Sequence, residues 1–148
     1  MNQDHDNLIG DFDGRYRLGV DSMDATHREL VDLVNRLAAS DKPGFAAGFA
    51  ELVAHTREHF AAEERLMQEC RFPAIAEHRG EHARVLGELE RFASQVASGR
   101  TQLARAYLVE MIPPWFDQHA ATMDSALAAC LKGSVAVAGG PDKARFPC

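Results

Sequence analysis

Residues 78–92 read HRGEHARVLGELERF, and this stretch decides which fold the sequence favours. Val85 and Leu89 lie four residues apart, a spacing at which apolar side chains share one face of an α-helix. His78 and His82 extend the same stripe, because residues four apart project from the same side of a helix. The pattern therefore predicts a helix that carries two histidines on the face it buries.

The same apolar periodicity continues on both sides of this stretch. It predicts four helices separated by short polar or proline-containing breaks, over residues 21–39, 45–70, 74–97 and 101–131. Pro113 and Pro114 fall inside the last helix, and we expect a kink or a division there because proline removes a helix hydrogen bond. Four amphipathic helices with short connections indicate an all-α, up-down-up-down four-helix bundle.

The two ends of the chain lack this periodicity. We expect an irregular N-terminal arm, the bundle and a C-terminal extension or tail over residues 1–20, 21–132 and 133–148 respectively. Gly133 is suited to end the last helix, since glycine readily adopts the left-handed conformation found after helix C-termini. Asp21, Ser22 or Asp24 can cap the first helix, and Pro73 suits the start of the third.

Composition restricts the classes of function. The chain has 148 residues, enough for one domain with a substantial core, and 46% are hydrophobic and 26% charged. A formal net charge of −6 disfavours nucleic-acid and anionic-membrane partners, which are bound by clustered lysine and arginine. No long apolar run or signal-like N-terminus is found, so we expect no membrane span and a cytoplasmic location. Cys70, Cys130 and Cys148 lack metal-site spacing and are interpreted as reduced thiols.

Histidine is the residue type that carries the chemistry. The sequence has seven histidines, and all except His5, for which we expect no specific role, fall within predicted helices. His59 and Glu63 lie four residues apart on an apolar face, and so share one side of their helix. His27 and His119 each lie between apolar residues at helical spacing. Buried imidazoles and carboxylates need partners, and a metal ion would supply one to all of them together.

The ligand types restrict the choice of metal. Five imidazoles and two carboxylates without cysteine suit iron, manganese or zinc, and a single tetrahedral zinc ion would leave three ligands unused. Carboxylates that can bridge therefore favour two metal ions close together. Asp124 is the least expected ligand, because it lies five residues after His119, about 140° around an ideal helix. It can reach the centre from the side or through a locally widened helix.

Four segments in this order resemble the hemerythrin family, specifically its bacterial single-domain members. They read GVDSMDATHREL at 19–30, HFAAEERLM at 59–67, HRGEH at 78–82 and WFDQH at 115–119, followed by Asp124. The resemblance covers residues 16–131 and implies a cofactor of two iron ions bridged by an oxo or hydroxo group. By this resemblance, one iron is bound by His78, His82 and His119. The other is bound by His27 and His59 and keeps an open position, while Glu63 and Asp124 bridge both.

The resemblance also implies a function. In this family dioxygen binds reversibly at the open iron and is held as hydroperoxide in a dry apolar pocket. Our candidate residues for that lining are Leu30, Phe60, Trp115 and Phe116. The chain is then an oxygen carrier, store or buffer and not an enzyme. The alternatives are an oxygen or redox sensing module acting through a protein partner, and an oxidase- or peroxidase-like di-iron enzyme. The histidine-rich ligand set favours reversible binding, because di-iron oxidases use mostly glutamates.

Some positions depart from the family pattern. His55 stands one turn before His59, where a tyrosine is usual. It can line the tunnel, hydrogen-bond a group behind the ligands, compete as a ligand, or be a half-exposed histidine without a role. Ala120 replaces a larger aliphatic residue, which can enlarge the pocket or open a water path. Charged residues near the histidine pair, including Glu81 and Arg84, are interpreted as a solvated face.

Overall fold

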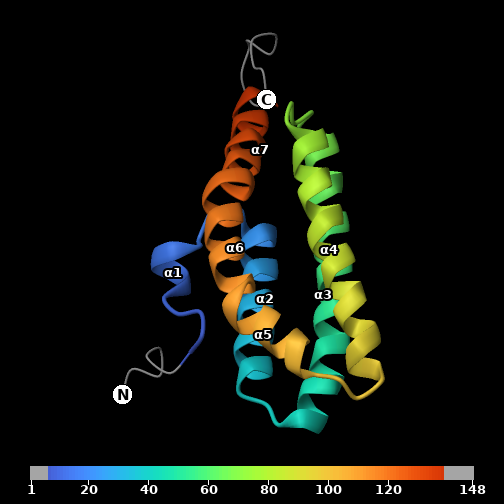
Figure 1. The fold of residues 1–148 in the computed structure, drawn as a ribbon. Helices are drawn as coiled ribbons and strands as arrows, with labels where there is room; N and C mark the ends of the chain where they lie inside the picture. The colour runs from blue at the N-terminus through green and yellow to red at the C-terminus, as the bar shows by residue number, and fades with distance from the viewer. Residues whose placement is uncertain (1–6, 139–148) are drawn as a thin grey trace.

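The computed structural model describes residues 7–138, so the expectations for His5 and Cys148 concern positions outside this range. The described chain is helical without strands, and its long helices run alternately down and up the molecule (Figure 1). The elements in chain order are α1 (Phe12–Arg15), α2 (Asp21–Ala38), α3 (Lys42–Glu69), α4 (Ile75–Ala97), α5 (Gln102–Glu110), α6 (Ile112–His119), η2 (Ala120–Asp124) and α7 (Ser125–Ala138). The predicted all-α bundle is confirmed, with α5 to α7 forming its fourth arm. None of the described helices is long and apolar enough to cross a membrane.

The start of α3 lies three residues before the predicted one. The Asp41 side chain accepts a hydrogen bond of 2.8 Å from the backbone N–H of Gly44, and so caps the helix. Pro43 occupies the first turn, where its missing N–H has no helix partner to lose. Helix α4 begins two residues after Pro73, at Ile75.

The predicted side-chain cap of α2 is wrong. Val20 occupies the cap position, and no side-chain hydrogen bond caps the helix there. Asp24 instead accepts hydrogen bonds from the backbone N–H groups of Leu18 and Gly19, at 2.7 and 3.0 Å. Its carboxylate thus holds the incoming chain against the first turn of the helix.

The fourth arm is divided where the two prolines predicted a kink or a break. Helix α5 ends at Glu110, and Pro113 and Pro114 lie in the first turn of α6. A π-helical turn, η2, then precedes α7. The predicted end at Gly133 is wrong, because this glycine is not among the described residues with positive φ and the helix continues to Ala138.

The N-terminal arm is less irregular than predicted, because it contains the helical turn α1. The backbone N–H of Ile9 donates to the Asn35 side chain at 2.8 Å, which attaches the arm to α2. Tyr16 is buried and donates its hydroxyl to Asp117, and Arg15 pairs with the same carboxylate at 2.9 Å. The arm therefore packs across α2 and α6.

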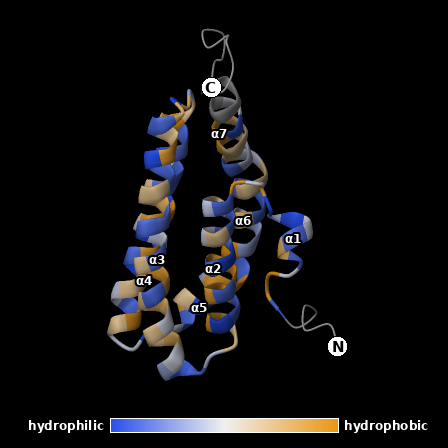
Figure 2. Ribbon diagram, turned by 180° about the vertical axis from the view of Figure 1, so that it is seen from behind, coloured by the Kyte–Doolittle hydropathy of each residue, from blue (hydrophilic) through white to orange (hydrophobic). Residues whose placement is uncertain are grey.

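The buried apolar residues form two clusters. Figure 2 shows hydrophobic and hydrophilic residues on different faces of the long helices, as expected when each buries one stripe. Leu30 and Phe60 belong to the larger cluster, and Met23 and Met67 belong to the smaller one. Since His27 lies between Met23 and Leu30 in α2, the polar site is enclosed between the two clusters.

Candidate metal centre

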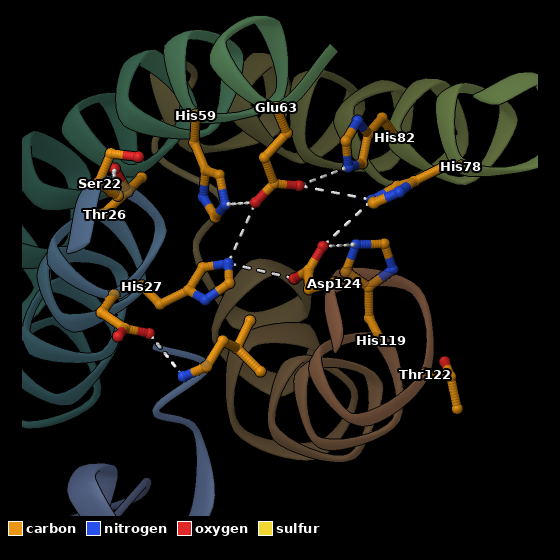
Figure 3. Close-up of polar contacts among 12 residues, drawn as sticks. Ser22, Thr26, His27, His59, Glu63, His78, His82, His119, Thr122 and Asp124 are labelled. Atoms are coloured by element: carbon orange, nitrogen blue, oxygen red, sulfur yellow. Dashed lines mark hydrogen bonds and ion pairs between the residues drawn. The ribbon is translucent and has the colours of Figure 1, made fainter. Parts of the chain in front are cut away.

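Seven polar side chains converge in the bundle interior, in two groups whose ligand atoms lie within 4.8 Å of one another (Figure 3). The larger group comprises Glu63, His78, His82, His119 and Asp124. The smaller group comprises His27, His59 and Glu63. They come from α2, α3, α4, α6 and η2, so every arm of the bundle contributes. The structure thus brings together all seven residues that the sequence singled out.

Glu63 belongs to both groups, and each of its oxygens faces one of them. Oε2 lies 2.6 Å from His59 Nε2 and 3.1 Å from His27 Nε2. Oε1 lies 3.1 Å from His82 Nε2 and 3.4 Å from His78 Nε2. One carboxylate is therefore placed between two sets of imidazoles, on the helix face predicted from its spacing to His59.

Asp124 lies opposite Glu63 and also faces both groups. Its Oδ2 is 3.1 Å from His27 Nε2, while Oδ1 is 3.1 Å from His78 Nε2 and 3.2 Å from His119 Nε2. The π-helical turn explains this position, because a wider turn places residue i+5 where an α-helix places residue i+4. Of the two ways considered for Asp124 to reach the centre, the structure therefore has the locally widened helix.

The donor atoms fit metal ions. All seven side chains are nearly inaccessible to solvent, from 0% exposed for His27 to 4% for His59. The Nε2 atoms and carboxylate oxygens point at one another, while no Nδ1 atom in the set has a hydrogen-bond partner within the described chain. Neutral imidazole Nε2 lone pairs and carboxylates are all acceptors, so a cation is needed between them. Imidazole and carboxylate are suitable ligands for iron or zinc.

Without a metal ion, protons take the place of the cation. Burial is the largest influence on the pKa of His27 and lowers it, but Asp124 and Glu63 outweigh burial and raise this pKa to about 10. The same opposition raises the pKa of His78 to about 9. Burial would raise the pKa of both carboxyl groups, yet the surrounding imidazoles hold them below the usual range. Metal binding must therefore displace protons from the site.

Aromatic rings enclose the imidazoles. Phe60 stacks on His82 with ring centroids 3.9 Å apart, and Trp115 stacks on His119 at 4.7 Å. Phe116 meets His27 edge-on at 5.5 Å. These three residues and Leu30 were the predicted pocket lining, and Leu30 is buried in the same apolar cluster as Phe60 and Phe116. Aromatic rings therefore lie against His27, His82 and His119.

His55 lies outside both groups, although its ring contacts His59 with centroids 5.6 Å apart. Its Nδ1 is 3.8 Å from a carboxylate oxygen of Glu29, at the wall of a groove between α2 and α3. Burial, the largest influence, and the neighbouring His59 lower the pKa of His55. The side chain is only 13% exposed, which makes it more buried than a half-exposed histidine.

One polar contact was missed from sequence. Glu81 was interpreted as part of a solvated face, but its Oε1 accepts a hydrogen bond of 2.9 Å from Trp115 Nε1. Arg84 donates to both of its oxygens, and this is the main reason why the pKa of Glu81 falls to about 2. The three-residue spacing from Glu81 to Arg84 was a signal for the ion pair, whereas nothing local predicts the contact with Trp115.

Comparisons with known proteins agree with this geometry. The family model described as the hemerythrin HHE cation binding domain matches residues 18–131. A bacteriohemerythrin of Ralstonia nicotianae is 35% identical over 107 residues, which cover 72% of this chain and 77% of that protein. A myohemerythrin of Riftia pachyptila is 28% identical over 101 residues, which cover 68% of this chain and 82% of that protein. A crystal structure of a leucine-to-alanine mutant of hemerythrin has the same fold, with a TM-score of 0.77 and 22% identity, covering 84% of this chain and 98% of that one.

Proposed function

The chain belongs to the hemerythrin family, and from this we propose that it is a non-haem di-iron protein that binds dioxygen reversibly. The observation that carries the proposal is the pair of buried ligand groups sharing Glu63. Two relatives named bacteriohemerythrin or myohemerythrin align over most of their own length, which supports the same role for the whole domain.

The two groups divide the ligands unequally. In our assignment one iron is held by His78, His82 and His119. The other iron is held by His27 and His59, with Glu63 and Asp124 between the two. Because the second set has one imidazole fewer, it is the set that leaves a coordination position open. When bound, the two irons supply the electrons and the open position that dioxygen binding requires.

The ligand side chains themselves are shielded from solvent, since none is more than 4% exposed. Phe60, Trp115 and Phe116 contact the imidazoles, and none of the three offers a charged group to the site. We assign these residues and Leu30 to the lining that shelters bound dioxygen. An apolar enclosure favours release of intact dioxygen, since protons and water would otherwise promote side reactions.

Reversible oxygenation tests this function. The iron-loaded protein is reduced under anaerobic conditions, exposed to dioxygen and degassed, while its near-ultraviolet and visible spectrum is recorded. We expect a spectrum that appears with dioxygen and is lost on degassing over repeated cycles. Permanent oxidation on the first exposure would contradict reversible binding, and would favour a redox sensor or an oxidase-like enzyme.

A further inference from the structure

The second ring nitrogen of His119, Nδ1, has no hydrogen-bond partner in the described chain. What we infer from it rests on the proposed role of His119 as an iron ligand. His119 Nε2 faces Asp124 at 3.2 Å, while the buried Nδ1 bonds to no protein group. Figure 3 shows this nitrogen on the side of the ring away from Asp124. A metal-bound histidine almost always donates its other N–H to a carboxylate, a carbonyl or water.

A cavity that opens to solvent has His119 in its lining. Its volume is about 190 Å³, and its lining comprises Glu81, Trp115, Gln118, His119, Thr122 and Met123. This space accommodates several waters, because one water molecule needs roughly 10–15 Å³ by this measure. Glu81, Gln118 and Thr122 provide the polar partners that an ordered water needs.

Glu81 is held rigidly in the wall of this cavity. Arg84 donates two hydrogen bonds to it, of 2.6 and 3.1 Å, and Trp115 donates a third, of 2.9 Å. The Trp115 ring also stacks on His119, so one side chain fixes the carboxylate and the imidazole relative to each other. Oε2 accepts one of these bonds and keeps a free lone pair.

A similar pairing occurs at the neighbouring imidazole. His82 Nδ1 lies 3.9 Å from Oε1 of Glu64, which also lies 3.7 Å from Arg79. Within this chain, Glu64 is therefore a precedent for an arginine-paired carboxylate near the Nδ1 atom of an imidazole in the larger group.

We propose that Glu81 is a positioning residue for His119, and that its carboxylate accepts the His119 Nδ1–H through a water molecule in this cavity. The arrangement fixes the proton on Nδ1, directs the Nε2 lone pair toward the metal and strengthens its donation. Glu81 thereby contributes to metal retention although it touches no metal.

Zinc release tests the proposal without requiring dioxygen binding. The iron-free protein is loaded with Zn²⁺, and transfer to excess chelator is timed for the wild type and for Glu81→Gln, which keeps an acceptor for Trp115. We expect one zinc ion to leave about 10-fold faster in the variant. Glu88→Gln is the matched control, because Glu88 also pairs with Arg84, at 2.9 Å, but lies outside the cavity lining. Its release rate should equal that of the wild type.

A second readout separates positioning from general loosening. In the ¹⁵N-labelled zinc form, the His119 Nδ1–H resonance should shift and exchange faster with solvent in Glu81→Gln, while that of His78 stays unchanged. If zinc release and His119 Nδ1–H exchange are equal in Glu81→Gln and the wild type, the proposed role of Glu81 is overturned and the ligand assignment is unaffected. A wild type that binds no zinc would overturn this role together with the ligand assignment beneath it.

Discussion

Glu63 is the residue on which both halves of the centre depend, because its two oxygens face different imidazole sets. Substituting it should therefore weaken both metal positions, whereas a histidine from one group should weaken one. We expect His82→Ala to retain one metal ion per chain and Glu63→Ala to retain neither firmly. Elemental analysis after gel filtration measures this, with circular dichroism as the control for folding. Loss of both ions in His82→Ala would contradict the two-group division.

His55 supplies the complementary prediction. It lies outside both ligand groups, so His55→Ala should keep two metal ions per chain. The same elemental analysis checks this result. A fall to one ion would mean that His55 is a ligand after all.

At the residue scale, helical spacing was enough to predict the pairs His59/Glu63 and His78/His82. Asp124 needed the family resemblance, because its five-residue offset from His119 does not fit a regular helix. Glu81 was missed, because its contact with Trp115 joins residues 34 positions apart. Local periodicity carries no information about such distant pairs.

At the scale of elements, the π-helical turn places Asp124 in the centre. The exposed Ala121 lies within this turn, and deleting it should restore a regular α-helix that keeps the aspartate on the His119 face. We expect this deletion to retain both metal ions. Inserting one alanine after Ala121 should instead turn Asp124 away by up to about 100° and weaken metal binding. Elemental analysis distinguishes the two, and metal loss in the deletion with retention in the insertion would contradict this account.

The four helices were predictable because each buries one continuous apolar stripe. Their ends were less predictable, since they depend on single contacts. The Asp41 cap begins α3 earlier than its apolar pattern does, and the helix passes through Gly133 where a stop was expected. The π-helical turn was foreseen only as one of two ways to bring Asp124 inward.

At the scale of the whole molecule, the centre links all four arms, so metal binding should stabilise the fold. A ligand at a thousand times its dissociation constant adds about 4 kcal/mol to the free energy of unfolding. We expect removal of the metal to lower the midpoint of thermal unfolding clearly. Differential scanning calorimetry of the metal-loaded and metal-free protein measures the difference, and equal midpoints would contradict a structural contribution of the centre.

This difference should also depend on pH. In the metal-free protein the pKa values of His27 and His78 are raised from 6.5 to about 10 and about 9. Their contribution to stability is fully present below pH 6.5 and is lost as the pH rises toward these values. Metal binding requires the deprotonated imidazoles, so the affinity for the metal rises over the same pH interval. The difference in unfolding midpoint should therefore widen from pH 6.5 to 9, and a narrowing would contradict the assigned proton positions.

The most direct test of the two-metal centre is a crystal structure of the iron-loaded protein with anomalous data collected at the iron absorption edge. We predict two anomalous peaks, one beside His78, His82 and His119 and the other beside His27 and His59, with Glu63 and Asp124 between them. A single peak, or a peak bound by His55, would contradict the account.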